Sequence, residues 1–218
     1  MKAEIGKKAP NFRVSKWVQG AETNIDQEQG NIILIEVFQV NCPGCFMYAI
    51  PEAISIYSKY GNRGVKVLGI ATAFEDFDKN TLENLELLAE KGVVLGESKK
   101  TLEKQGMLRT GSKLPYSIPF PLGMDQLTKQ VDEISDSQIE DFAQSQIQNF
   151  SQQPKEIQAK LFAEVKKYIR SKLYSAETFE KFALQGTPSS ILVDRDGILE
   201  DVSFGQIGKL EPMIEKLL

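Results

Sequence analysis

An almost uninterrupted run of β-branched and aromatic residues covers residues 31–40, with Glu36 as its charged exception. A strand that is buried on both faces has this composition, because helices cover both sides of a parallel sheet. The run ends just before Pro43, which suits the first position of a helix that we expect to continue to about Tyr60. Residues 64–73 are a second apolar run. These segments predict a strand, a helix and a parallel strand.

The remaining pattern predicts a mixed α/β chain whose central part is interrupted by helices. Residues 125–182 change to Gln, Ser, Lys and Glu with apolar residues at helical spacing, which indicates two or three inserted helices. We therefore expect one domain over residues 1–218, with a helical insertion at 125–182 before a late β-hairpin. The other expected elements are a helix at 79–91, an interrupted extended segment at 114–124, strands at 185–194 and 198–204, and a helix at 208–218.

Composition and charge narrow the possible partners. The chain has 218 residues, of which 41% are hydrophobic, so it can bury a sizeable core without disulfide staples. Its 26 basic and 30 acidic residues give a net charge of -4 without a basic block, which argues against nucleic acid as a partner. We find neither a secretion signal nor a membrane span. The expected location is cytoplasmic for the chain as given, or periplasmic or extracytoplasmic if a signal segment was removed.

Both cysteines of the chain lie in one Cys-x-x-Cys motif, Cys42-Pro43-Gly44-Cys45, and the chain has no histidine. The absence of histidine excludes Ser-His-Asp and Cys-His catalysis and attached haem, and one subunit lacks the ligands of a structural zinc site. Redox chemistry is the favoured interpretation, without a metal or a further cofactor. The alternatives are a metal clamp completed across a dimer and two inert core thiols.

The position of the motif assigns a role to each cysteine. Cys42 falls at a helix N-terminus, where free backbone N–H groups and the helix dipole stabilise the thiolate that attacks a disulfide. Cys45 lies one turn further into the helix, where it can attack the resulting mixed disulfide. We therefore expect Cys42 to be the nucleophile and Cys45 the resolving thiol.

Several segments together resemble the redoxin branch of the thioredoxin superfamily, the TlpA-like and AhpC/TSA-like proteins. They are Ala9-Pro10-Asn11-Phe12, the strand into the Cys-x-x-Cys motif, Gly186-Thr187-Pro188, and Val193-Asp194-Arg195-Asp196-Gly197. The resemblance covers residues 5–75 and 183–218. It implies a thioredoxin-like fold with a central mixed sheet flanked by helices. It also implies a thiol-disulfide oxidoreductase that acts on protein thiols and disulfides, exchanges electrons with a redox partner and serves cell redox homeostasis.

The resemblance also implies a binding place for substrate. Thr187-Pro188 would be a cis peptide beside the cysteines, with the backbone of Thr187 pairing to an extended substrate segment. Pro43 and Gly44, between the cysteines, would contact the same segment. The alternative is an ordinary trans proline at the start of a strand.

Glu36 stands six residues before Cys42, where thioredoxins carry a buried acid, and the resemblance gives it that role. Burial would raise its pKa toward neutrality and suit it to take the proton of Cys45. The alternative is an edge strand that leaves Glu36 in solvent.

Two other functions stay open. A peroxidase of the AhpC/TSA kind is less favoured, because Gln39-Val40-Asn41 lacks the Pro and Thr or Ser that precede a peroxidatic cysteine. A module that binds a soft metal such as Cu(I) would need nearby methionines, and only Met47 is adjacent.

Some features leave details open. Asn41 replaces a frequent aromatic residue, and Pro43-Gly44 reverses the order found in thioredoxin, so the reduction potential and the direction of redox exchange are open. Pro51 either lies in the helix or ends it near Ile50. The oligomeric state is also open. The insertion could cover the cysteines, contact a partner, dimerise or simply pack on the sheet.

Overall fold

The computed structural model describes residues 2–129, 135–147, 149–171, 174–206 and 208–218. The chain forms two compact units, one made of Met1–Gln126 with Ala176–Leu218 and one made of Leu127–Ser175. The strands are β1 (Val14–Gln19), β2 (Ile32–Phe38), β3 (Val65–Ala71), β4 (Leu122–Asp125), β5 (Leu127–Lys129), β6 (Tyr174–Ala176), β7 (Ser189–Val193) and β8 (Leu199–Phe204). The helices are α1 (Ile50–Tyr60), α2 (Leu82–Lys91), α3 (Gly96–Lys104), α4 (Asp136–Gln146), α5 (Lys155–Ser171), α6 (Glu177–Lys181) and α7 (Leu210–Leu217).

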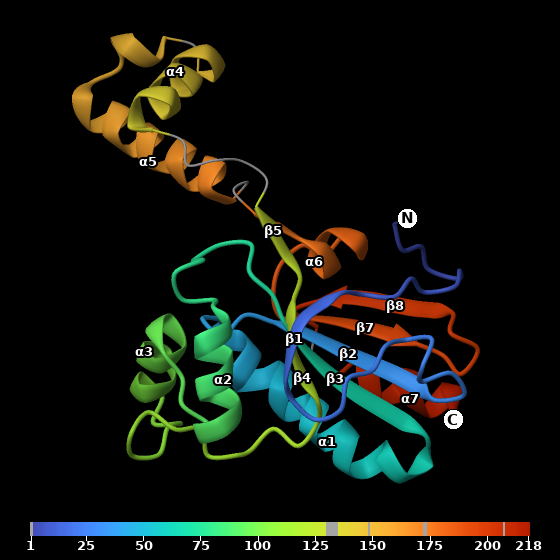
Figure 1. The fold of residues 1–218 in the computed structure, drawn as a ribbon. Coiled ribbons are helices and arrows are strands. Elements are labelled where there is room, and N and C mark those ends of the chain that lie inside the picture. Colours follow the sequence, from blue (N-terminus) through green and yellow to red (C-terminus); the bar gives the residue numbers. More distant parts are fainter. Residues whose placement is uncertain (1, 130–134, 148, 172–173, 207) are drawn as a thin grey trace. The chain divides into compact units, whose positions relative to one another are not determined.

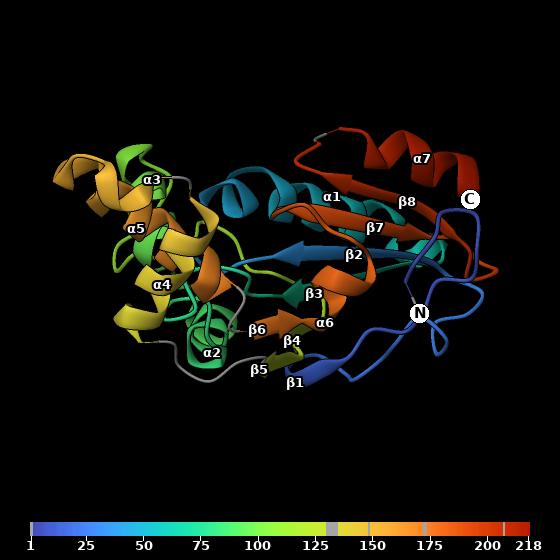
Figure 2. The same cartoon turned by 90° about the horizontal axis from the view of Figure 1, so that it is seen from above.

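The larger unit is built on a six-stranded mixed sheet with the order β1-β4-β3-β2-β7-β8. Strands β2, β3 and β4 are parallel, whereas β1, β7 and β8 each pair antiparallel to their neighbours. Helices α1 and α7 lie on one side of this sheet and α6 on the other (Figure 1). Figure 2 shows the strands side by side from above. The predicted α/β class with a central mixed sheet flanked by helices is confirmed.

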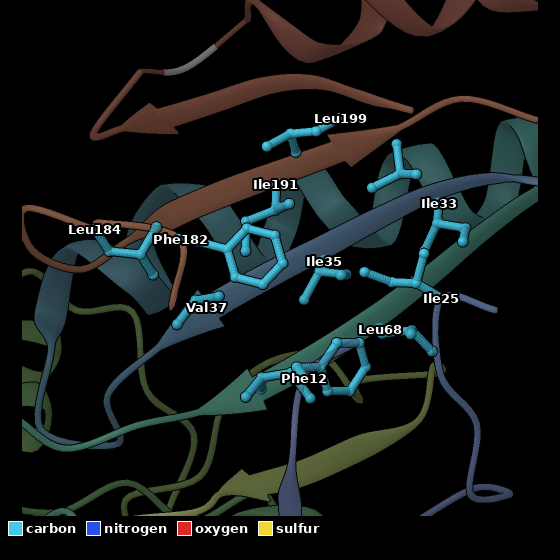
Figure 3. Close-up of a cluster of buried hydrophobic side chains, with 12 residues drawn as sticks. Phe12, Ile25, Ile33, Ile35, Val37, Leu68, Phe182, Leu184, Ile191 and Leu199 are labelled. Carbon is cyan, nitrogen blue, oxygen red and sulfur yellow. The ribbon is translucent and has the colours of Figure 1, made fainter. Parts of the chain in front are cut away.

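Strand β2 lies in the middle of the sheet, and all of its residues are buried. On one face, Ile33, Ile35 and Val37 pack in a cluster with residues of β3 and β7 (Figure 3). Phe12, Phe182 and other apolar side chains cover this cluster. Because side chains alternate along a strand, Glu36 points to the opposite face, where α1 lies.

The helix that follows Cys42 begins at Pro43, contains a π-helical turn over Cys45–Ala49, and continues as α1 through Pro51. Pro51 follows the π-helical turn and has no backbone N–H to donate, and the carbonyl oxygen of Phe46, five residues earlier, accepts from the Tyr116 hydroxyl at 2.6 Å instead. The alternative in which the helix ends near Ile50 is therefore wrong. Tyr60 at its end is buried and donates a hydrogen bond to Glu215 of α7 at 2.7 Å, which ties the two helices together.

The smaller unit contains a pair of helices. Ser135 caps α4 with a capping box to Gln138, and Lys166 of α5 reaches Asp136 at 2.5 Å. The pattern of residues 125–182 predicts helices alone, but β5 and β6 form an additional two-stranded sheet. With three residues each, these strands are too short to show an alternating pattern.

Asp125 ties together the two segments of the larger unit that flank the insertion. Its side chain is fully buried, accepts a hydrogen bond from Thr72 at 2.8 Å, and accepts another from the backbone N–H of Thr178 at 3.0 Å. Burial raises the pKa of Asp125 despite these hydrogen bonds. The insertion therefore leaves and rejoins the sheet beside one buried carboxyl group.

The interrupted extended segment expected at residues 114–124 is present, since three prolines precede its strand, which covers Leu122–Asp125. Two other elements differ from the pattern-based prediction. Strand β1 is an unpredicted edge strand whose residues are only partly buried or exposed. Helix α3 is also unpredicted, because only Ser98 and Leu102 of it are buried and it lacks an apolar stripe.

Candidate active site

The two cysteines lie at the carboxyl end of the central strand. After β2 ends at Phe38, the backbone N–H of Cys42 donates to the carbonyl of Gln39 at 3.1 Å, and the helix starts one residue later. Cys42 and Cys45 form a disulfide with their Cα atoms 5.4 Å apart. The structure therefore shows the pair in its oxidised form.

The two sulfur atoms have different surroundings. Cys45 is fully buried, whereas Cys42 is partly exposed. The backbone N–H of Cys45 donates to the Cys42 sulfur at 3.2 Å, a contact that would stabilise negative charge on that sulfur once the disulfide opens. A partner's sulfur can therefore reach Cys42 more easily than Cys45, and Cys42 is the better placed nucleophile.

The Thr187–Pro188 peptide bond is cis, and it lies beside the cysteines as the resemblance implies. The Cys42 sulfur lies 3.6 Å from the carbonyl oxygen of Thr187. Pro188 and Gly44 both line a pocket of about 190 Å³, so two of the four predicted binding residues lie at one pocket. Strand β7 begins directly after the proline and fixes its position in the sheet.

Glu36 is fully buried in β2. Ser190 of β7 is its cross-strand partner and donates a hydrogen bond to Glu36 Oε2 at 2.7 Å, whereas Oε1 has no hydrogen-bond partner among the described residues. The pKa of Glu36 is raised to about 8, mainly by burial; the Ser190 hydrogen bond lowers it in part, and charge repulsion from Glu52 adds to the increase. The edge-strand alternative for Glu36 is wrong, because β2 has a neighbour on each side.

Two exposed aromatic side chains lie close to the cis proline. Tyr48, which lines the pocket with Pro188, is 47% exposed, and Phe204 at the end of β8 is also 47% exposed. The Phe204 ring lies so close to Gly186 that a Cβ there would be 2.5 Å from it. Single exposed apolar residues are common, but these two lie on either side of the segment that carries the cis proline, where an extended polypeptide could cover them.

Asn41 anchors the segment before Cys42 by hydrogen bonds that the sequence pattern did not reveal. Its backbone N–H donates to the side-chain oxygen of Asn80 at 2.9 Å. Its side-chain NH₂ group donates to the Asp76 carboxylate at 2.9 Å, and its side-chain oxygen accepts from the backbone N–H of Glu97 at 2.7 Å. A Cβ on Gly96, whose φ is +53°, would lie 2.2 Å from this oxygen, so glycine is required there. The only sequence signal was the unusual asparagine beside the motif.

Replacing the buried Asn41 with Ala is expected to destabilise the fold by about 1–3 kcal/mol, because the N–H of Glu97 and the Asp76 carboxylate lose their hydrogen-bond partner. Urea denaturation of the oxidised protein measures the change. Asn62→Ala on an exposed turn is the matched control and should be nearly neutral. Equal losses in the two variants would show that the Asn41 hydrogen bonds contribute nothing.

Tyr116 forms a hydrogen bond to the helix that contains Cys45. Its hydroxyl donates to the carbonyl oxygen of Phe46 at 2.6 Å, and burial raises the pKa of Tyr116. Phe46 lies in the π-helical turn, where the widened backbone changes the usual pattern of helical hydrogen bonds. The sequence gave no signal for this contact, since Tyr116 comes from a proline-rich segment seventy residues away.

Searches for relatives give structural neighbours only. The thioredoxin-like superfamily protein SPOA0173 has a TM-score of 0.58 and 23% sequence identity, covering 97% of this chain and 96% of that chain. A thiol-disulfide isomerase from Corynebacterium glutamicum has a TM-score of 0.59 and 24% identity, covering 98% of this chain and 96% of that chain. No protein-family model and no curated protein matches the sequence. The neighbours show a thioredoxin-like fold, which confirms the predicted one.

Two further findings concern other kinds of site. No three His, Cys, Asp or Glu side chains gather as metal ligands in the part of the chain that the structure describes. Among the same residues, no helix is both long enough and apolar enough to cross a bilayer.

Proposed function

We propose that the protein is a thiol-disulfide oxidoreductase that exchanges disulfides with protein substrates. The observation that carries the proposal is the asymmetric pair, an accessible Cys42 bonded to a buried Cys45 at the end of the central strand with Pro188 beside it. The Corynebacterium neighbour is named for activity of this kind. At that identity it supports the fold, so the proposal rests on the site.

The reduced pair would act in two exchanges. In the first, the Cys42 thiolate attacks one sulfur of a substrate disulfide, a Cys42–substrate bond forms, and the other substrate sulfur leaves as a thiolate that takes a proton from water. In the second, Cys45 gives up its proton and attacks Cys42, which releases the second substrate thiolate and forms the Cys42–Cys45 disulfide. The substrate gains the two electrons that the pair loses, and a redox partner reverses the change.

Glu36 would hold the proton of the buried thiol. In the oxidised form, with its pKa raised to about 8, Glu36 carries a proton at neutral pH. When an incoming thiolate opens the disulfide, this proton can pass to the leaving Cys45 sulfur, and in the opposite direction Glu36 takes the proton back. One carboxyl group therefore serves as acid in one direction and as base in the other.

The substrate would bind across the cis proline. We expect an extended segment to pair with the backbone of Thr187 and to pass over Pro43 and Gly44, with Tyr48 and Phe204 as apolar contacts at its sides. Backbone pairing explains how one enzyme could act on proteins of different sequence.

The test is reduction of insulin by dithiothreitol, followed by the turbidity of the precipitating B chain. We expect micromolar protein to accelerate the reaction severalfold over dithiothreitol alone. The control is the same protein after reduction and alkylation, since the two cysteines of the chain are the only thiols to be blocked. Equal rates with the active and the alkylated protein would refute the proposed function.

A further inference from the structure

The buried position of Glu36 raises the question of how its proton reaches solvent. The carboxyl group is fully buried, so a proton taken from Cys45 has no direct contact with bulk water. When Glu36 already carries a proton, it can accept the proton of Cys45 only after it has released its own. The side chains around Glu36 must therefore provide a path.

Polar residues form a row across the sheet at the level of Glu36. In the strand register, Glu36 of β2 lies opposite Ser190 of β7, and Ser190 lies opposite Ser203 of the edge strand β8. Side chains that are opposite in neighbouring strands share a face. Ser203 is 6% exposed, and its hydroxyl has no hydrogen-bond partner among the described residues. A row of this kind is unusual in a core, since buried polar groups are normally paired.

Ser190 connects this row to the pocket beside the cysteines. Its hydroxyl lies 2.7 Å from Glu36 Oε2, and the residue also lines the pocket of about 190 Å³. That volume is large enough for water. A serine hydroxyl can accept one proton while it donates another, so it can relay a proton without changing its charge.

Glu52 of α1 lines the same pocket. One of its oxygens, Oε1, accepts a hydrogen bond from the backbone N–H of Gly208 at 3.0 Å, which holds the side chain in place. Burial raises the pKa of Glu52, and the nearby Glu211 raises it further. A partly exposed carboxyl group at a pocket wall can exchange protons with both the pocket and the solvent.

We propose that Ser190 and Glu52 form the route by which Glu36 exchanges its proton with solvent, with Ser190 as the inner relay and Glu52 as the outer proton acceptor. This inference rests on the proposed function of the cysteine pair. Ser190 and Glu52 both act through Glu36 and are positioning residues for its proton.

Charged groups of the described residues lie near the route on three elements, α1, β8 and α7. Glu52 is the charged side chain that acts on Glu36, from α1. On β8, Asp201 lies two residues before Ser203, on the same face of the strand, and pairs with Lys209 at 2.7 Å. On α7, Glu211 pairs with Lys59 and lies 2.8 Å from the Tyr60 hydroxyl. Glu52 is therefore the carboxylate on this face that lines the pocket.

The experiment uses the reduced full-length protein and the chromogenic disulfide DTNB. Attack by Cys42 releases one thionitrobenzoate, and attack by Cys45 on the mixed disulfide releases a second, so the two absorbance phases report the two exchanges separately. In Ser190→Ala we expect an unchanged first phase and a second phase slowed roughly tenfold, less than the roughly hundredfold cost of losing an acid-base group. Ser190→Thr keeps the hydroxyl and should restore the second phase.

Glu52→Gln distinguishes a relay from simple repulsion. Loss of the outer acceptor should lower the plateau of the second-phase rate against pH roughly threefold or more, whereas loss of charge repulsion would only move the profile to lower pH. Glu211→Gln is the matched control, because it removes a neighbouring carboxylate that does not line the pocket. We expect its plateau to equal that of the wild type.

The outcomes separate this inference from the proposed function. A wild-type protein that releases no second thionitrobenzoate would overturn both. A biphasic wild type with unchanged second phases in Ser190→Ala and Glu52→Gln would overturn the proton route alone. A profile of Glu52→Gln that only moves along the pH axis, with its plateau kept, would remove Glu52 from the route.

Discussion

A Cys45→Ser variant is expected to stay covalently bound to its substrate, whereas Cys42→Ser is expected to form no adduct at all. The reason is the difference in exposure between the two sulfur atoms, since Cys42 is partly exposed and Cys45 is fully buried. Without the second thiol, the mixed disulfide on Cys42 cannot be resolved from within, so it accumulates. The expected contrast is nearly complete labelling against none.

Mass spectrometry under non-reducing conditions measures this contrast. Each reduced variant is mixed with glutathione disulfide and quenched with acid, and the mass increase of one glutathione is counted for each protein. The wild type should return to the mass of its internal disulfide. A glutathione adduct on Cys42→Ser that forms as fast as on Cys45→Ser would contradict the assignment of the nucleophile.

The folding of the variants must be checked, because serine in place of the buried Cys45 adds an unpaired hydroxyl, which costs about 1–3 kcal/mol. Cys45→Ala avoids the hydroxyl and should trap the same adduct. If Cys45→Ala is folded by circular dichroism and still leaves no adduct, the two-exchange mechanism is wrong.

The central part of the fold could be predicted because its signals are local. The apolar run at residues 31–40 is continuous enough to predict a buried strand by itself. Pro43 suits the first position of a helix because its backbone angle is already helical and its missing N–H is not needed there. The late hairpin at residues 185–204 also carries its turn in the sequence. These segments became β2, the helix after Cys42, and β7 with β8.

The missing elements depend on contacts that are distant in sequence. Strand β1 has no continuous apolar run, and it is a strand because it pairs with β4, more than one hundred residues later. Helix α3 has almost no apolar stripe, and its start is held by Asn41 and by the bond from Ser98 to the carbonyl of Val40 at 2.9 Å. Patterns within one segment do not contain such pairings.

The same distinction applies to the site. The roles of Cys42 and Cys45 followed from their position at a helix start, whereas Thr187-Pro188 and Glu36 were placed by resemblance to thioredoxins. The sequence did not indicate a role for Ser190, because Ser190 contacts Glu36 only through the antiparallel register that places the two residues opposite each other. Strand pairing decides which residue becomes the partner of Glu36, and serine is too common in sequences to indicate such a contact.

Replacing Glu36 with Gln is expected to change how stability depends on pH. The pKa of Glu36 is about 8 in the folded protein against an ordinary value of 4.5, so folding takes up a proton between these values. The contribution of Glu36 to stability is therefore fully present below about pH 4.5 and is lost as the pH rises through about 8. Each unit of this difference corresponds to about 1.4 kcal/mol, so the whole contribution is roughly 5 kcal/mol.

Urea denaturation of the oxidised wild type and of Glu36→Gln at about pH 5 and about pH 9 measures the effect. At the acid pH both carry a neutral side chain at this position, so their unfolding free energies should be similar. At the alkaline pH the wild type must bury a carboxylate whose Oε1 has no partner among the described residues, and the variant should be more stable by several kcal/mol. The exposed Glu90→Gln should leave the difference between the two pH values as it is in the wild type. If Glu36→Gln and the wild type differ by the same amount at both pH values, Glu36 does not titrate with a raised pKa, and its role as the proton carrier of Cys45 would have no physical basis.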